Sequence, residues 1–479
     1  MAFGFLGSHS LLQAALAQSS RATTSQAGSP RHTGRPNFVF ILCDDLGWGD
    51  LGCYGHPHIK TPNLDRLAAQ GTLYTQFYVS SGVCSPSRAA FMTSHFPARH
   101  RIHGHLATPE QNEARGMPDW LDARVPTVTR LLQSAGYATA HFGKWHLGGG
   151  PGAPDPGAYG IGDHRSVNSN GPGWEDEQDA YFRARSTRLI VDETIRFIEA
   201  NRDSPFYVNV WTLLPHALLH PTDEQMAPYR QFAPGGTKFP YKGAMQIYYA
   251  SVSDIDEQVG RLMNKLDELG LADNTVVFFS SDNGPEDIHI RNASHSGVGS
   301  PGPFRGRKRS LYEGGVRMPW IVRWPGHIPA RRVDDVTVMG AVDFLPTVCS
   351  MAAVAVPDDL APDGEDRSAA LVGNAKQRTR PLMWEWRFIV HGDTLNRSPM
   401  LAIRDGKWKL LMNPDRSRVE LYDIPNDPSE LNNRAKRHPD VVTRLSKRVL
   451  AWQATLPEGP LQPGAGSNAY PWPRGSPDG

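Results

Sequence analysis

The sequence predicts an α/β protein with a mostly parallel sheet sandwiched by helices, plus a smaller C-terminal antiparallel sheet with one helix. Short apolar runs alternate with amphipathic helical segments through most of the chain, which favours strand–helix–strand units. Clusters of polar residues follow directly on the apolar runs, where open α/β sheets place their ligands. Beyond about residue 355 the pattern changes to short strands joined by turns.

The length and the charge of the chain limit its possible domain organisation and its possible partners. Its 479 residues are too many for a single core and suit a large domain with a smaller one. The 50 basic and 49 acidic residues balance, so no overall field selects nucleic acid or a membrane surface. Four cysteines without close spacing argue against a disulfide framework: Cys43, Cys53, Cys84 and Cys349.

The composition divides the chain into four parts. Residues 1–35 form a signal-like segment and a linker, because the apolar start ends in Ala15-Leu16-Ala17 and a Ser/Thr/Gly/Arg-rich stretch follows. This start predicts a periplasmic or secreted protein. The large domain is expected at 36–355, a small α+β subdomain at 380–457 and a loose tail at 458–479. No later run is long enough to span a bilayer.

The first half of the large domain reads as alternating strands and helices. The run 36–43 is apolar throughout, as expected of a strand buried on both faces. The segment 61–71 reads as a helix with Pro near its start and Gly after its end. Further elements are expected as a strand at 73–78, a helix at 126–135, a strand at 137–142 and a loop at 149–178.

Strands and helices also alternate in the second half of the large domain, and the pattern changes in the C-terminal region. The large domain should contain helices at 187–200 and 243–269, and strands at 206–211, 275–281 and 317–322. Residues 356–380 read as a polar linker. An Asp-Gly turn inside 401–410 predicts a hairpin. A strand at 420–424 and a helix at 440–454 complete the smaller sheet.

The segment 82–90 places a cysteine at the predicted start of a helix. A helix N-terminus offers unpaired N–H groups and the positive end of a dipole. Arg88, four residues after Cys84, adds a planar cation. Anything held at Cys84 therefore faces a site suited to an oxyanion. The alternative interpretation is a buried thiol at the end of a core helix.

Two acidic motifs follow predicted strands. Asp44 and Asp45 come directly after the first strand, and adjacent carboxylates repel unless a cation lies between them. Asp282 and Asn283 follow the strand at 275–281. Oxygen ligands of this kind suit Ca²⁺ or Mg²⁺. The alternatives are an Asp that caps the next helix and an ordinary Asp-Asn-Gly turn.

Two basic motifs also follow predicted strands. Lys144 and His146 follow the strand at 137–142, and His216 follows the strand at 206–211. Because these strand ends share one edge of the sheet, we expect these side chains to converge with the acidic motifs. Taken singly, a histidine or lysine at a strand end is more often structural or solvated.

The segment Cys84-Ser85-Pro86-Ser87-Arg88 resembles the signature of the type I sulfatases. Gly143-Lys144-Trp145-His146-Leu147-Gly148 and the segment from Lys308 to Gly315 are similar to two further motifs of that family. The resemblance departs at Ser94 and His95, where the family usually has Gly and Arg. It implies an alkaline-phosphatase-like fold.

The resemblance also implies the roles of these residues. Cys84 would be oxidised to Cα-formylglycine by a formylglycine-generating enzyme, and the aldehyde hydrate would be the nucleophile. The family's metal ligands match Asp44, Asp45, Asp282 and Asn283, which with the formylglycine hold one divalent cation, most often Ca²⁺. Sulfate would be held by Arg88, Lys144, Lys308, His146 and His216. Asp282 would accept the nucleophile's proton, His216 or Lys308 would protonate the leaving group, and His146 would be the second base.

The resemblance predicts a sulfuric ester hydrolase that acts on a sulfated carbohydrate or an aryl sulfate. The segment 48–55 looks like arylsulfatases and N-acetylgalactosamine-6-sulfatases. Two alternatives remain open at this point. One is a phosphate or phosphonate monoester hydrolase of the same superfamily, and the other is a non-catalytic binder of sulfated glycans in which Cys84 stays unconverted.

Overall fold

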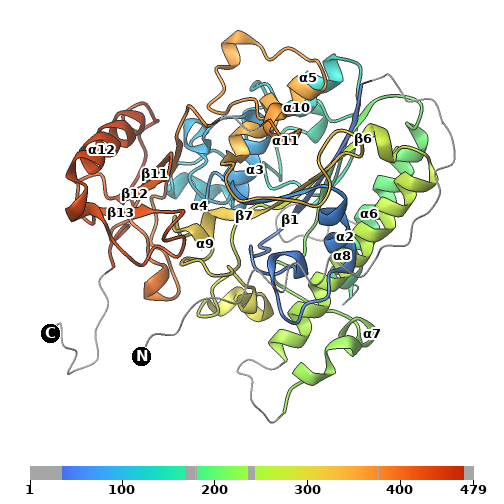
Figure 1. The fold of residues 1–479 in the computed structure, drawn as a ribbon, viewed down its shortest axis with the longest axis horizontal. Coiled ribbons are helices and arrows are strands. Elements are labelled where there is room, and N and C mark those ends of the chain that lie inside the picture. The colour runs from blue at the N-terminus through green and yellow to red at the C-terminus, as the bar shows by residue number, and fades with distance from the viewer. Residues whose placement is uncertain (1–34, 168–178, 180, 236–242, 375–376, 469–479) are drawn as a thin grey trace. The chain divides into compact units, whose positions relative to one another are not determined.

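A nine-stranded sheet organises the large domain (Figure 1). The computed structural model describes residues 35–167, 179, 181–235, 243–374 and 377–468. Eight strands run in the order β4-β3-β5-β1-β6-β7-β2-β8, and β9 pairs with β2. The strands are β1 (Asn37–Cys43), β2 (Thr72–Tyr78), β3 (Ala138–Lys144), β4 (Asp163–Val167), β5 (Phe206–Trp211), β6 (Thr275–Ser281), β7 (Arg317–Arg323), β8 (Arg332–Asp334) and β9 (Met339–Gly340).

The sheet is mostly parallel, as predicted. β1 pairs in parallel with both β5 and β6, and β3 does so with β4 and β5. β7 is the exception, since it runs antiparallel to both β6 and β2. The parallel strands β3, β5, β1 and β6 lie side by side, so their carboxyl ends share one edge of the sheet.

Helices cover both faces of the sheet, which explains the continuous apolar character of β1. Its side chains alternate between two hydrophobic clusters, with Phe38 and Phe40 in one and Val39 and Ile41 in the other. The first cluster includes the helices α3 (Cys84–Thr93), α5 (Val128–Ser134) and α10 (Phe344–Met351). The second includes α2 (Pro62–Gln70), α6 (Phe182–Ala200) and α8 (Ala244–Glu268).

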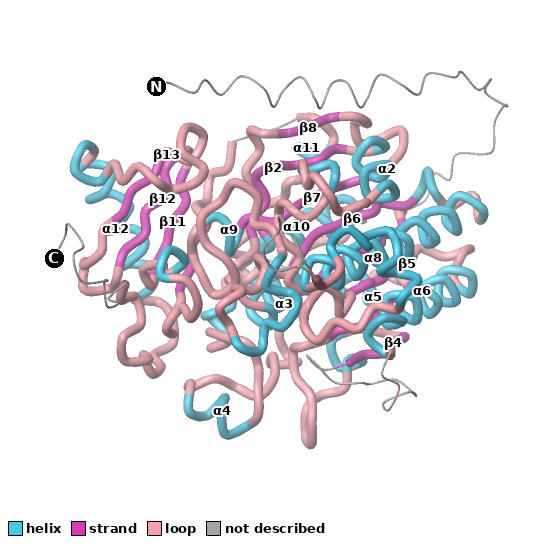
Figure 2. The backbone as a smooth tube through the Cα atoms, turned by 90° about the horizontal axis from the view of Figure 1, so that it is seen from below, coloured by secondary structure: helices cyan, strands magenta, loops and turns pink. Residues whose placement is uncertain are grey.

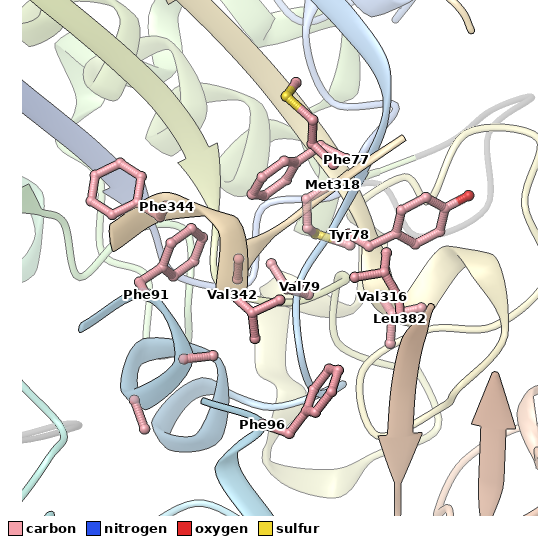
Figure 3. Packing of buried hydrophobic residues seen from close by; sticks show 14 of the residues in the cluster. Phe77, Tyr78, Val79, Phe91, Phe96, Val316, Met318, Val342, Phe344 and Leu382 are labelled. Atoms are coloured by element: carbon pink, nitrogen blue, oxygen red, sulfur yellow. The ribbon is translucent and has the colours of Figure 1, made fainter. Parts of the chain in front are cut away.

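Aromatic packing holds α3 against the sheet (Figure 3). The Phe91 ring of α3 lies 5.0 Å from the Phe40 ring of β1 and 5.7 Å from the Phe344 ring of α10. Phe77 of β2 stacks on Trp320 of β7 at a centroid distance of 4.1 Å. Such rings each bury a large apolar area and pack with specific geometry. The start of α3, where Cys84 lies, is thereby fixed relative to the strand ends.

A second, four-stranded antiparallel sheet follows, in the order β10-β11-β12-β13. Figure 2 shows α12 beside it. The predicted hairpin is present, and its turn residue Gly406 has a φ of 58°. The elements are β10 (Leu382–Glu385), β11 (Leu401–Asp405), β12 (Trp408–Met412), β13 (Glu420–Asp423) and α12 (Pro439–Gln453).

Several elements differ from the sequence prediction. The expected loop at 149–178 contains β4, an edge strand whose half-buried polar residues show no apolar alternation. The helix expected at 187–200 begins five residues earlier, at Phe182. The sequence analysis missed β8, β9, α10 and β10, and the expected linker 356–380 contains a short helix, α11 (Ser368–Leu371).

Smaller helical segments connect these elements. They are α4 (Pro109–Ala114), α7 (Asp223–Met226) and α9 (Glu313–Val316). In the part of the chain that the structure describes, no helix is long and apolar enough to cross a membrane. Residues 1–34 of the predicted signal-like segment and linker, and residues 469–479 of the predicted tail, lie outside the described residues. The predicted domain boundaries stay predictions.

A buried ion network ties the two sheets together. Lys409 of β12 contacts Glu313 of α9 at 2.8 Å and Glu430 at 3.0 Å. Arg317 of β7 contacts the other oxygen of Glu313 at 3.1 Å. Burial alone would raise the pKa of Glu313, but Lys409 and neighbouring arginines lower it to about 2. The carboxylate is therefore ionised and depends on its cationic partners.

Replacement of Lys409 by methionine should destabilise the protein strongly. Lys409→Met removes the cation between Glu313 and Glu430. Among the described residues, this leaves Glu430 without a cationic partner and Glu313 with its neighbouring arginines alone, and breaking such a buried network costs about 3–5 kcal/mol. Urea unfolding followed by tryptophan fluorescence measures the loss. The control is Lys407→Met, whose side chain is 53% exposed beside Asp423 and should cost under about 1 kcal/mol. Equal losses in the two variants would contradict this account.

Candidate active site

Four neighbouring strands deliver the polar motifs to one edge of the sheet. Asp44 and Asp45 follow β1, and Asp282 and Asn283 follow β6. Lys144 is the last residue of β3. The loop after β5 carries His216, and β5 lies between β3 and β1. The order of the strands in the sheet therefore brings together residues that are up to about 240 positions apart in the sequence.

Three carboxylates and a thiol form a tight buried cluster. One ligand atom from each of Asp44, Asp45, Cys84 and Asp282 lies within 4.8 Å of the others. The Cys84 Sγ is 3.5 Å from Asp44 Oδ1. Neither Asp44 nor Asp45 acts as a helix cap, since both carboxylates point to lysines of the site. Three carboxylates this close require compensating positive charge.

Three cations provide part of this compensation. Lys144 Nζ lies 2.7 Å from Asp44 Oδ2, and Lys308 Nζ lies 2.7 Å from Asp45 Oδ2. Arg88 donates to Asp282 Oδ2 from Nε at 2.9 Å and from its terminal nitrogen at 2.6 Å. All three cations are buried. These charge-assisted bonds fix the positions of both the acids and the cations.

The flanking arginines of Lys308 point elsewhere. Arg307 donates to the carbonyl oxygens of Glu286 and Gly297, and Arg309 forms a two-pronged pair with the Glu286 carboxylate. Within the segment 307–309, it is Lys308 whose amine contacts Asp45. This agrees with the role that the family resemblance implies for Lys308.

Cys84 is the first residue of α3, as predicted, and Arg88 lies one turn further on. Burial raises the pKa of the Cys84 thiol, although Lys144 and Lys308 oppose this shift. The side chain is therefore a neutral thiol at ordinary pH. Since the thiolate is the reactive form, an unmodified Cys84 is a poor nucleophile.

Asn283 provides a direct test of whether the cluster suits a cation. Its Nδ2 donates to Asp45 Oδ1 at 2.7 Å, whereas its Oδ1 is buried without a hydrogen-bond partner. A buried carbonyl oxygen left unpaired is costly. A hard divalent cation would satisfy this oxygen together with the carboxylates, and Ca²⁺ and Mg²⁺ prefer such ligands. The residues of the cluster therefore fit a bound metal.

The two histidines occupy different positions. His216 Nε2 lies 3.8 Å from Asp45 Oδ2, and its Nδ1 donates to the carbonyl oxygen of Ala217. His146 Nε2 donates to the carbonyl oxygen of Leu106 at 2.9 Å, which leaves Nδ1 as a buried acceptor without a partner. Burial lowers the pKa of both, to about 3 for His216. The positive charges of Lys144 and Arg88 lower the pKa of His146 further.

Comparison with known proteins identifies the family. The model of the sulfatase family matches residues 36–354, and that of the C-terminal region of N-sulphoglucosamine sulphohydrolase matches residues 304–455. The chain belongs to the sulfatase family. It is therefore a sulfuric ester hydrolase with the alkaline-phosphatase-like fold.

Curated relatives and a solved structure agree with this assignment. N-acetylgalactosamine-6-sulfatase of Canis lupus familiaris is 34% identical over 81% of this chain and 73% of its own length. N-acetylgalactosamine-6-O-sulfatase of Bacteroides thetaiotaomicron is 29% identical over 88% of this chain and 94% of its own. The crystal structure of Ps i-CgsB in complex with k-i-k-neocarrahexaose has a TM-score of 0.73 at 26% identity and covers 87% of this chain and 92% of its own.

The backbone of the sulfatase is strained at its site. Asp45, His146 and Arg309 have φ values of 65°, 52° and 75°, in the left-handed region that few non-glycine residues adopt. Such conformations persist only where the surroundings enforce them, and they concentrate at functional sites. The hydrogen bond from the Asp45 amide to Asp282 Oδ1, at 3.2 Å, holds one of them in place.

The sequence analysis missed two residues that support the site of this sulfatase. Arg183 of α6 donates to the carbonyl oxygens of Leu213 and His216, and its charge acts on Asp44 and Asp45. Glu286 pairs with Arg309 and lies 3.9 Å from Lys308 Nζ. Arg183 lies in a helix without a motif, and Glu286 lies in the loop after β6. No local signal marks either residue.

Calcium should stabilise the metal-stripped sulfatase, and Asp45→Asn should weaken that effect. A ligand that binds only the folded state adds about 2.7 kcal/mol at 100 times its Kd, which appears as a rise in Tm. Asp45→Asn removes one charged oxygen from the cluster, so the rise should shrink at each Ca²⁺ concentration. Differential scanning calorimetry with CaCl₂ and MgCl₂ measures it.

The matched control is Asp203→Asn, whose carboxylate is 93% exposed after α6. This variant should keep the full rise in Tm. A wild-type protein whose Tm responds to neither cation would refute the metal site.

Proposed function

We propose that this sulfatase releases inorganic sulfate from a sulfated carbohydrate, with a formylglycine derived from Cys84 at the reacting centre. The observation that carries the proposal is the cluster of Cys84 with three carboxylates and three buried cations. The named activities of the curated relatives, N-acetylgalactosamine-6-sulfatases, support a carbohydrate substrate. Glycosaminoglycans and algal polysaccharides are the candidate classes.

Ca²⁺, with Mg²⁺ as the alternative, and the formylglycine at position 84 are the groups that the site would hold. Asp44, Asp45, Asp282 and Asn283 would bind the cation. When bound, the metal supplies Lewis-acid charge, and the formylglycine hydrate supplies a hydroxyl nucleophile for attack on sulfur.

Charge balance explains why such a site attracts sulfate. In the cluster, Asp44, Asp45 and Asp282 are matched by Arg88, Lys144 and Lys308. A divalent cation would therefore leave a surplus of positive charge. The buried arginine and lysines can then bind the peripheral oxygens of a sulfate ester and stabilise the charge that develops on them.

The charge states of the side chains near this centre support the proton transfers of the proposal. Burial opposes the charged form of Lys308, but Asp45 outweighs it and the pKa of the amine lies above its usual value. Lys308 therefore carries a proton that a leaving sugar oxygen requires. His216 is the second candidate donor, but its ring is neutral with the proton on Nδ1, so Nε2 would first have to take up a proton. Asp282 would accept the proton of the attacking hydroxyl. His146 Nδ1, an unpaired acceptor, suits the later removal of a proton from position 84.

A screen of sulfate release over defined sulfated oligosaccharides tests the proposed function. Matched phosphate and phosphonate monoesters belong in the same screen. Faster hydrolysis of the phosphorus esters would favour the alternative assignment, and binding without any turnover would favour a sulfated-glycan binder. The maturation partner, a formylglycine-generating enzyme, and a periplasmic or secreted location are parts of the same proposal.

Mass spectrometry should find position 84 modified in active protein. Conversion of the cysteine to formylglycine lowers the mass of the tryptic peptide by about 18 Da. The peptide that contains Cys43 and Cys53 serves as the internal control and should keep its thiol mass. Rapid sulfate ester hydrolysis by a preparation whose Cys84 is entirely thiol would rule out this nucleophile.

Loss of Lys308 or His216 should affect sugar sulfates more than activated aryl sulfates. A nitrophenolate leaves without a proton, whereas a sugar alkoxide requires one. General acid catalysis contributes about 10²–10⁴-fold, so Lys308→Ala or His216→Ala should lower kcat/KM by roughly 100-fold more on a sulfated sugar than on nitrophenyl sulfate. Equal losses on both substrates would assign the residue to sulfate binding alone.

A further inference from the structure

A cavity of about 410 Å³ opens beside the candidate active site. Four separate parts of the chain build it: the segment around α4, Arg309, the loop after β10 and residues 460–463. Its lining includes His105, Arg115, Arg309, Trp386, Phe388 and His391. None of the cavity's residues has a role in the site described above except Arg309, which pairs with Glu286.

Two residues connect this cavity to the reacting centre. Arg309 follows Lys308 directly, its amide donates to the carbonyl oxygen of Gly82 at 2.7 Å, and its charge acts on Asp45 and Cys84. The His105 ring lies 6.4 Å from the His146 ring. A substrate with its sulfate ester at Cys84 would therefore extend naturally into the cavity.

In the described part of the cavity, the positive charge of Arg115 is unpaired. Among the described residues that line it, none is Asp or Glu. Arg309 is committed to Glu286, but Arg115 forms no ion pair within the described part of the chain. It donates to the carbonyl oxygen of His105 at 3.3 Å and lies 5.8 Å from the centre of the Phe388 ring. An arginine held in this way is suited to a carboxylate or sulfate.

One wall of the cavity is aromatic. The rings of Trp386 and Phe388 meet at 5.2 Å in a T-shaped arrangement. The buried Nε1 of Trp386 has no hydrogen-bond partner in the structure. An aromatic surface with a few convergent polar groups is typical of a pocket for a small organic ligand, and here the polar groups are cationic or neutral donors.

We propose that this cavity binds a second anionic group of the substrate, a carboxylate or sulfate on the same sugar or on its neighbour. Arg115 is the principal contact, with Arg309 and His105 beside it and the aromatic wall against the sugar ring. The preferred substrate is then a polyanionic glycan. A singly sulfated sugar or an aryl sulfate leaves the cavity's charge unmatched. This inference rests on the proposed function for the sulfate ester itself.

Competition against nitrophenyl sulfate tests the proposal. The probes are N-acetylgalactosamine 6-sulfate, with one anionic group, and N-acetylgalactosamine 4,6-disulfate, with two. In the wild type, the apparent inhibition constant of the disulfate should be about tenfold lower, the usual size of a charged hydrogen bond. Arg115→Gln should raise the constant of the disulfate about tenfold and leave that of the monosulfate within twofold.

Two further variants act as controls. Arg115→Lys keeps a cation at this position and should restore most of the selectivity. Lys447→Gln changes the net charge by the same amount on the exposed face of α12 and should alter nothing. Wild-type protein that binds both saccharides equally, or an Arg115→Gln variant that weakens both equally, would overturn the proposal.

The outcome for the cavity is separable from that for the proposed function. If neither nitrophenyl sulfate nor any sulfated oligosaccharide of the screen is hydrolysed, the sulfatase mechanism fails. Calorimetric titration of the two saccharides into wild type and Arg115→Gln then measures binding in the cavity directly. If nitrophenyl sulfate is hydrolysed normally but the two saccharides do not differ, the cavity proposal alone fails.

Discussion

The accumulation of like charge at one edge of the sheet is the constraint on which the rest of the structure depends. Parallel pairing of β3, β5, β1 and β6 forces Asp44, Asp45 and Asp282 into a space of less than 5 Å. Such a cluster is stable only if every carboxylate has a partner. Lys144, Arg88 and Lys308 supply these partners, and the unpaired oxygen of Asn283 marks where a further positive charge fits.

The same constraint explains the supporting structure around the site. The aromatic contacts of α3 hold Cys84 and Arg88 at fixed positions relative to the strand ends. The Lys308 segment leads into α9, where Glu313 is joined to Lys409 of the second sheet. The C-terminal sheet is thus coupled to the site through the chain that carries its lysine. The loop after β10 also lines the neighbouring cavity, so residues from the regions of both sheets surround the space next to the active site.

The departure of the cysteine motif from the family pattern has a local structural explanation. Ser94, at the position where the family usually has glycine, ends α3 with a φ of 62°. Its amide donates to the carbonyl oxygen of Ala90 at 2.9 Å, and its carbonyl oxygen accepts from Asp363. His95 contacts the carbonyl oxygen of Leu360 and the ring of His100. These bonds hold a conformation that glycine would adopt freely.

The sequence by itself determined the order of the long strands and helices from β1 to β7 other than β4, and it named most residues of the candidate site. Apolar runs such as 206–211 and 275–281 matched their strands, since strands buried on both faces leave an unmistakable pattern. It could not predict β4 or the early start of α6, because an edge strand and a helix end depend on neighbours more than on local residues. Only the tertiary structure decided that Arg183 and Glu286 support the site and that Arg115 faces a cavity. These residues belong to no motif, and their surroundings arise from segments that are distant in the chain.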